Sequence, residues 1–354
     1  MVFKMCAILF GILLSLPVMA QNPEQEPILS RIKIEVPSIS QMDRLAQKFE
    51  ILRSSDRFLE MIVPQDALRE VEAIAGFKAL ILEADIRAEA LKSLGRDEYP
   101  SISDIEARLK RYAQDYPTFV AYEQYGTANQ YPLMALKLSD NPQVSENEPA
   151  VLLAAATHGD ELITTMITLA VIERFLKDYG VDARITRLVN EREIWFIPTV
   201  SPYGYANRTR YVGGVDPNRD FPWPDQPQHT SIACIDGLRN FYASKKLVAS
   251  IDYHAYGKMI MYPWAYTRNA VPNESVFNKL TKDMAQFNNY SYGQISKIIY
   301  IAQGSSADYF YWKHASKAIA SEVGNSKIPH GAEITRVIDE NMNAAIHFIE
   351  FSAN

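Results

Sequence analysis

A series of short apolar runs, separated by helical segments, restricts the possible folds of this chain more than any other feature. The run at 150–156 contains only alanine, valine and leucine, and mostly apolar runs recur at 194–200, 248–253, 259–263 and 318–323. A strand that is apolar along its whole length is buried on both faces, which is typical of parallel sheets covered by helices. We therefore predict an α/β domain with a mixed, mostly parallel central sheet flanked by helices.

Segments with helical periodicity lie between and after these runs, at 162–176, 273–287 and 335–351. A further amphipathic helix is predicted over Ser103–Tyr112, where Ser103 and Glu106 have the spacing of a capping box. In sheets of this kind, binding sites form where the carboxyl ends of the strands meet, at topological switch points. We therefore expect the functional side chains at the ends of the apolar runs.

Residues 1–20 have the features of a secretory signal peptide. Lys4 precedes an apolar run from Cys6 to Val18, and Val18-Met19-Ala20 has the small-x-small pattern of a cleavage site. The apolar run is too short to span a bilayer comfortably. We expect a secreted or periplasmic protein that has no membrane contact after cleavage, with an uncleaved anchor as the alternative.

A small α+β domain is predicted at 21–92, ahead of a catalytic domain at 93–354. Its strand-like and helical segments follow the order βαββαβ, the pattern of a split-βαβ unit. The charged stretch at 88–100 is interpreted as a linking helix and the junction. Two interpretations remain open for the small domain: a generic packing domain, or an inhibitory or chaperoning prosegment, which would bring in a processing protease as a partner.

The charge of the chain argues against nucleic acid as a partner. There are 36 Lys and Arg residues against 42 Asp and Glu residues, and the formal net charge is −6. Nucleic-acid-binding domains carry a basic patch or stripe, and this composition provides no such excess.

The strongest local signal for chemistry is the segment Thr157–Glu161. His158 and Glu161 are three residues apart, directly after the apolar run at 150–156 and before a predicted helix. His254 ends a second apolar run, at 248–253. Catalytic zinc takes three protein ligands of these types and keeps a fourth position open. We predict one zinc ion per chain, bound by His158, Glu161 and His254.

The spacing alone is a weak signal, because His-x-x-Glu occurs twice more. His330 and Glu333 have no apolar run before them, and His347 and Glu350 lie inside the predicted closing helix. Neither pair stands at the exit of a buried strand. The context therefore favours the first pair as the metal ligands.

Several separated motifs resemble, in order, those of the zinc carboxypeptidases of the carboxypeptidase A type. The resemblance covers Tyr99 to Phe351 and includes Gly214–Phe221, Ile251–His254 with the following Tyr262–Trp264, and Tyr300–Asp308. It implies a zinc-dependent metallocarboxypeptidase that releases C-terminal residues from peptides. The substrate is then a peptide, or a peptidoglycan-derived molecule, with a free C-terminal carboxylate.

The resemblance also implies roles for the reacting groups. Glu322 matches the catalytic glutamate, which takes the proton of the zinc-bound water and passes it to the leaving amine. Arg210 matches the arginine that stabilises the developing oxyanion, although Arg208 is only two residues away and stays an alternative. Asp216 matches the acid that orients the first zinc-bound histidine.

Substrate recognition follows from the same resemblance. Asn218 and Arg219 would hold the terminal carboxylate, and Tyr300 would close over it. Family members that prefer basic termini carry an acid at the position of Ala307, so we predict a hydrophobic or aromatic terminal residue. Asp160 stands where digestive members carry arginine, which removes a positive charge from the binding site for extended substrates.

Two alternatives remain. The pair Asn218 and Arg219 fits any substrate with a free α-carboxylate, so a peptidoglycan stem-peptide carboxypeptidase or amidase, or an amino-acid deacylase of the same fold, is one. A catalytically inert protein that binds peptides is the other.

Overall fold

The computed structural model describes residues 28–36, 38–54, 57–86 and 98–352. The predicted signal peptide and most of the predicted linking helix therefore lie outside the described residues. Within the described part of the chain, no helix combines the length and the apolar character needed to cross a membrane.

The larger sheet has eight strands in the order β11-β10-β12-β9-β7-β8-β6-β5. Neighbouring strands are parallel from β12 through β9 and β7 to β8, and between β10 and β11, whereas β10–β12, β8–β6 and β6–β5 are antiparallel. The predicted mixed, mostly parallel sheet is confirmed. The strands are β5 (Val120–Ala128), β6 (Tyr131–Leu138), β7 (Ala150–Ala155), β8 (Glu193–Ile197), β9 (Leu247–His254), β10 (Met259–Tyr262), β11 (Ser291–Gln294) and β12 (Lys317–Glu322).

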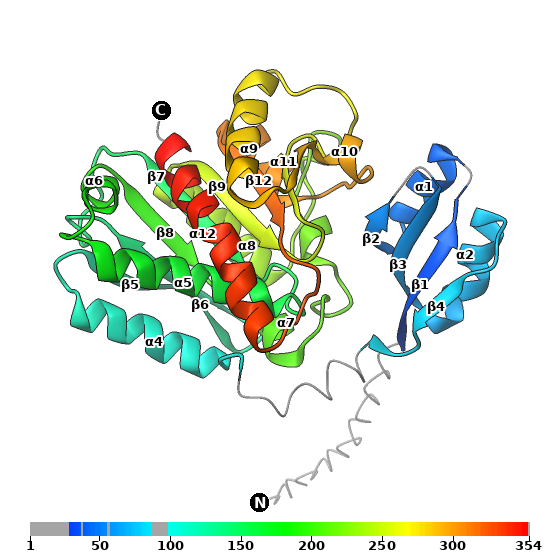
Figure 1. The fold of residues 1–354 in the computed structure, drawn as a ribbon, viewed down its shortest axis with the longest axis horizontal. Coiled ribbons are helices and arrows are strands. Elements are labelled where there is room, and N and C mark those ends of the chain that lie inside the picture. Colours follow the sequence, from blue (N-terminus) through cyan, green and yellow to red (C-terminus); the bar gives the residue numbers. More distant parts are fainter. Residues whose placement is uncertain (1–27, 37, 55–56, 87–97, 353–354) are drawn as a thin grey trace, which may run out of the picture.

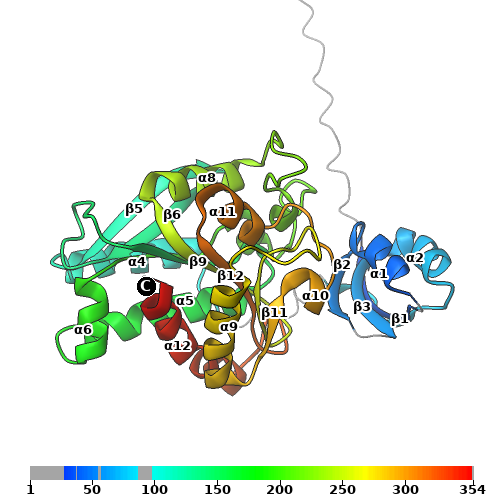
Figure 2. The same ribbon diagram turned by 90° about the horizontal axis from the view of Figure 1, so that it is seen from above.

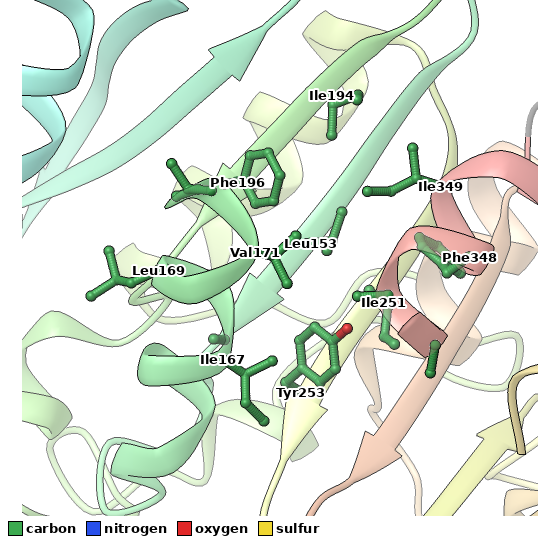
Figure 3. Packing of buried hydrophobic residues seen from close by; sticks show 14 of the residues in the cluster. Leu153, Ile167, Leu169, Val171, Ile194, Phe196, Ile251, Tyr253, Phe348 and Ile349 are labelled. Atoms are coloured by element: carbon green, nitrogen blue, oxygen red, sulfur yellow. The ribbon is translucent and has the colours of Figure 1, made fainter. Parts of the chain in front are cut away.

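Helices cover both faces of this sheet (Figure 1). In β7, Val151 and Leu153 belong to one buried cluster, and Leu152 and Ala154 to the other, as alternation along a strand requires. Figure 3 shows Leu153 and Ile251 facing Phe348 and Ile349 of the closing helix. The helices of the first cluster are α4 (Ile102–Asp115), α5 (Leu162–Asp178), α6 (Ala183–Asn190), α9 (Glu274–Asn288) and α12 (Ala332–Ser352), and those of the second are α8 (Ala233–Lys245) and α11 (Ser306–His314).

Helix α4 begins two residues earlier than the predicted capping box requires. Ser101 is the N-cap, and its Oγ accepts a hydrogen bond from the backbone N–H of Asp104, while the Asp104 carboxylate accepts one from the N–H of Ser101. The predicted pair Ser103 and Glu106 is wrong, because aspartate at the third helical position closes the box as well as glutamate does.

The smaller sheet has the order β2-β3-β1-β4, with antiparallel neighbours. Its strands and helices follow the predicted order along the chain. The elements are β1 (Leu29–Glu35), α1 (Ile39–Ala46), β2 (Glu50–Ser54), β3 (Phe58–Pro64), the short helix η1 (Gln65–Ala67), α2 (Leu68–Ala75) and β4 (Leu80–Glu83). Figure 2 shows the edge strand β2 beside α10 (Ile295–Ile298) of the larger unit. Ile51 of β2 belongs to the same buried cluster as Ile295 and Ala302.

Candidate metal centre and active site

The three predicted metal ligands lie at the carboxyl ends of two neighbouring parallel strands. His158 follows β7, and Glu161 is the N-cap residue directly before α5. His254 is the last residue of β9, which pairs with β7 in parallel. Ala156, between β7 and His158, has a left-handed backbone with φ 50°. This strained turn redirects the chain so that His158 faces His254.

The ligand atoms of these residues surround one point. Nδ1 of His158 is 2.9 Å from Oε1 of Glu161 and 3.1 Å from Nδ1 of His254, and Nδ1 of His254 is 3.1 Å from Oε2 of Glu161. Zinc bonds of about 2.1 Å in tetrahedral geometry separate two ligand atoms by about 3.4 Å. The observed spacing thus needs only a small expansion to hold zinc, and the His₂Glu donor set fits it.

Each imidazole is oriented by an acid on the side away from this point. Nε2 of His158 is 3.0 Å from Oδ1 of Asp216, and Nε2 of His254 is 3.1 Å from Oδ2 of Asp252. When Nε2–H donates to the carboxylate, Nδ1 keeps its lone pair for a metal. Asp216 was predicted in this position, and Asp252 was not.

Asp252 is also held by hydroxyl groups on two other segments. Thr157 donates to its Oδ1 at 2.8 Å, and Ser306 donates to its Oδ2 at 2.7 Å. The sequence contains a signal for it, because residues two apart on a strand face the same side. Asp252 is two residues before His254 on β9 and therefore points to the same face.

Gly159 permits the close approach that completes this turn. A Cβ atom on Gly159 would lie 1.8 Å from the carbonyl carbon of Gly204, in the helix α7 (Pro202–Asn207). The backbone of the metal-binding turn therefore packs directly against α7, which has no space for a side chain at this position.

Glu322 lies beside the metal ligands on the next strand. It ends β12 and is paired in register with His254 of β9. Burial and the neighbouring carboxylate of Glu161 raise the pKa of Glu322 to about 7. Burial would also raise the pKa of Glu161, but His158 and His254 outweigh it and hold that pKa well below its ordinary value. The pKa values of the two carboxyl groups in this site are therefore shifted in opposite directions, that of Glu322 upward and that of Glu161 downward.

Arg210 lies at the metal centre, and Arg208 does not. Nη1 of Arg210 is 3.0 Å from Nδ1 of His158 and 3.6 Å from Oε1 of Glu161. Its Nε and Nη2 donate to Oδ2 of Asp216 at 2.9 Å and 2.8 Å. Arg208 ends α7 and stacks on the ring of Tyr205. Of the two candidates from the sequence, only Arg210 can reach a group bound at the metal centre.

The residues predicted to bind a terminal carboxylate border the same space. Asn218 lies in the short helix η2 (Pro217–Arg219), with its Nδ2 3.1 Å from Nε2 of His254. Nη2 of Arg219 donates to the Tyr300 hydroxyl at 3.0 Å. Gly304, at φ 73°, passes so close that a Cβ atom would lie 2.3 Å from the carbonyl oxygen of Arg219. This contact fixes the backbone that carries Arg219.

A cavity of about 50 Å³ is lined by the three predicted metal ligands, Glu322, Arg210 and the residues predicted to bind a terminal carboxylate. Next to the carboxylate-binding residues its wall is apolar or bears only hydroxyl groups. Among its apolar and hydroxyl-bearing residues are Ile295, Ile299, Ala302, Ser305, Ala307 and Ala320. Glu50, Ile51 and Leu52 of β2 also line the cavity, so the small unit forms part of its wall.

The two competing His-x-x-Glu pairs lie elsewhere. Nδ1 of His330 is 2.6 Å from Oε2 of Glu98, near the start of the larger unit. His347 lies on α12, where it packs beside the rings of Phe287 and Phe351. Of the three His-x-x-Glu pairs, only His158 and Glu161 lie together with a third candidate ligand, His254.

Comparisons with known proteins agree with this geometry. A family model described as zinc carboxypeptidase matches residues 105–344. A zinc carboxypeptidase of Saccharothrix mutabilis subsp. capreolus is 26% identical over 312 residues, which cover 73% of this chain and 70% of that protein. Carboxypeptidase D of Anas platyrhynchos is 25% identical over 288 residues, 70% of this chain but only 20% of that longer protein.

Solved structures share the fold. Carboxypeptidase A of Helicoverpa armigera has a TM-score of 0.74 at 18% identity and covers 92% of this chain and 97% of its own. Thrombin activatable fibrinolysis inhibitor has a TM-score of 0.70 at 17% identity and covers 91% of this chain and 98% of its own.

Proposed function

This chain belongs to the zinc carboxypeptidase family, and on that premise we propose that it releases C-terminal residues from peptides by zinc-dependent hydrolysis. The observation that carries the proposal is the convergence of His158, Glu161 and His254 on one point beside Glu322. When bound there, zinc supplies Lewis-acid polarisation of the scissile carbonyl and lowers the pKa of water.

Glu322 is proposed to act as the general base and then as the general acid. It takes a proton from the attacking water as the water oxygen adds to the scissile carbonyl carbon. It then gives this proton to the amine nitrogen as the carbon–nitrogen bond breaks. A carboxyl group with a pKa of about 7 suits both steps at neutral pH.

Arg210 is proposed to stabilise the negative charge that develops on the carbonyl oxygen. Its side chain is buried and held by Asp216, so no reorganisation is needed when the charge appears. Asn218 and Arg219 would hold the terminal carboxylate, for which the planar guanidinium is suited. Tyr300 would close over the bound terminus from its place beside Arg219.

The terminal side chain is proposed to be hydrophobic or aromatic. The wall around Ala307 provides no charge for a basic side chain, and its apolar groups favour an apolar occupant. A Lys-terminal peptide that is cleaved faster than its Phe-terminal counterpart would contradict this preference.

The small unit is proposed to be an inhibitory prosegment of a secreted or periplasmic protein. It contacts the larger unit through Glu50 and Arg210, Glu60 and Tyr256, and Asp43 and Arg268. The Tyr300 hydroxyl also points to the carbonyl oxygen of Ile51. Mass spectrometry of the mature protein tests this: a mature chain that keeps residues 21–90 with full activity would show that the unit is a structural domain.

An assay of amino-acid release tests the function itself. Peptides that differ only in their C-terminal residue are incubated with the zinc-loaded protein and with the same protein after chelation. We expect release of single L-amino acids, fastest for Phe-type termini, and none after chelation. Release of D-amino acids or diaminopimelate from purified muropeptides, with no release from peptides, would instead support a peptidoglycan enzyme.

A further inference from the structure

A second, larger cavity adjoins the metal centre. Its volume is about 520 Å³, and it lies between the small sheet and the larger unit. Three cationic side chains of the larger unit line it: Arg208, Arg210 and Lys327. The small unit contributes Glu50, Glu83 and Arg31 to the opposite wall. Arg31 pairs with Glu83, and Glu50 is the acid that contacts the cations of the larger unit.

Glu50 places its carboxylate between two of these cations. Its Oε1 is 2.9 Å from Nη1 of Arg210 and 2.8 Å from Nζ of Lys327. The Glu50 side chain is only 4% exposed. A buried carboxylate is tolerated only where such partners replace its hydration. The larger unit therefore already holds one carboxylate at this position.

Other polar groups of the cavity wall are still without partners. Asp160 uses its Oδ2 to accept from Nζ of Lys327 at 2.7 Å, but its buried Oδ1 has no hydrogen-bond partner. Nε and Nη1 of Arg208 are buried and equally without partners. Asp160 itself is 8% exposed. Because buried polar atoms normally find partners, these groups indicate a ligand that supplies both an acceptor and an N–H donor.

The loop after β12 fixes the position of Lys327. The backbone N–H of Ile163, in the first turn of α5, donates to the carbonyl oxygen of Lys327 at 3.2 Å. Asp160 stands where the resemblance implied an arginine in digestive family members, so that positive charge is missing here. Lys327, from another segment, supplies a positive charge to the same region. Asp160 neutralises part of the charge of Lys327. Asp216 occupies Nε and Nη2 of Arg210, so Nη1, which carries two N–H groups, is the nitrogen that faces both the metal centre and Glu50.

We propose that Lys327, together with Arg208 and Arg210, forms an anion-binding subsite for an acidic residue that precedes the scissile bond, and that Glu50 occupies this subsite here. The inference rests on the proposed function, because that function sets the direction in which a bound peptide runs through the site. The terminal residue lies near Arg219 and Ala307, and Arg210 lies between that pocket and Lys327. A peptide that runs from the pocket past the metal centre reaches Lys327 with its upstream residues.

Peptide binding to a slow variant of the full chain tests the subsite. The protein carries Glu50→Ala, to vacate the subsite, and Glu322→Gln, to suppress turnover, and it is loaded with zinc. Calorimetry compares two pairs of Phe-terminal peptides, which contain Glu or Gln either at the penultimate position or one residue earlier. Charge-assisted hydrogen bonds predict that Glu binds about tenfold more tightly than Gln in at least one pair.

Two further variants assign this preference to Lys327. Lys327→Gln is expected to bring the ratio of the two affinities close to one, and Lys327→Arg to preserve it. Lys279→Gln, at an exposed lysine of α9, is the control and should leave the ratio unchanged. Thermal unfolding of each variant verifies that it is folded.

Equal affinity for Glu and Gln in both pairs, including no measurable binding of either, would overturn the proposal. A preference for Glu that persists in Lys327→Gln would do the same. Because the binding measurement needs no turnover, the two proposals fail separately. If the variant prefers Glu but the zinc-loaded wild type hydrolyses no peptide, the proposed function is rejected and the subsite is still supported.

Discussion

His254 and Glu322 end two adjacent parallel strands and stand opposite each other in the register of β9 and β12. His254 is a predicted metal ligand, and Glu322 is the proposed base. Their separation is therefore set by the hydrogen bonds of the sheet and not by a loop. A site built on strand ends in this way is held in place before any substrate arrives.

Glu322→Gln is predicted to lower kcat by about 10²- to 10⁴-fold, because the amide cannot take the proton of the attacking water. Zinc content should not change, since Glu322 is not a ligand. Glu333→Gln, at a half-buried residue of α12 that pairs with Arg336, is the control. Equal activity of Glu322→Gln and the wild type would remove Glu322 from the mechanism.

Asp252→Asn is predicted to weaken zinc binding by about 10- to 100-fold, because the amide no longer fixes the tautomer and the orientation of His254. Competition with a chelator of known affinity measures the change. Asp236→Asn, at a half-buried residue of α8 that pairs with Arg239, serves as the comparison. An unchanged zinc affinity in Asp252→Asn would show that the hydrogen bond to His254 is dispensable.

Ala307→Asp is predicted to shift the preference from Phe-terminal to Lys-terminal peptides, with a change in the ratio of the kcat/KM values of about tenfold or more. The new carboxylate would face the part of the cavity wall that is otherwise apolar or bears only hydroxyl groups. Ala302→Ser, which adds only a hydroxyl group to the same wall, is the matched control. If the ratio stays constant in Ala307→Asp, Ala307 does not contact the terminal side chain.

The contact between the two units is predicted to weaken in acid. Burial would raise the pKa of Glu50, but Arg210 and Lys327 outweigh it and lower the pKa below the ordinary value of 4.5. A lowered pKa means that the carboxylate stabilises the folded state above pH 4.5 and that this contribution is lost as the pH falls through the lowered pKa.

The free energy of unfolding, measured from pH 7 to pH 3, checks this in the wild type and in Glu50→Gln. The wild type should be the more stable protein at pH 7, and the difference should shrink toward pH 3. A difference that is constant over this range would show that the charge of Glu50 does not contribute.

Local patterns predicted the parts of the site that depend on one strand and its exit. The run at 150–156 predicted β7, and the residues after it predicted His158 and Glu161 as ligands. The hairpin of β5 and β6 was not predicted, because the burial of β5 is too irregular to give a clear alternation. The capping box of α4 was misplaced because two overlapping segments have the same spacing.

Lys327 could not be predicted from local patterns. It lies in an irregular loop, and its importance depends on contacts with Asp160 and Glu50, which are 167 and 277 residues away in the sequence. Only the folded chain brings these three side chains together. Asp252 is a different case: it was not predicted, although its place two residues before His254 on one strand would have been sufficient to find it.

Metal analysis of the purified protein tests the central claim most directly. The account predicts one zinc ion per chain in the wild type and nearly none in His254→Ala, with hydrolysis of peptides lost in the variant and in the chelated wild type and regained by the wild type when zinc is added. A wild-type protein that cleaves C-terminal residues without zinc, or a His254→Ala variant that keeps its full zinc content, would contradict it.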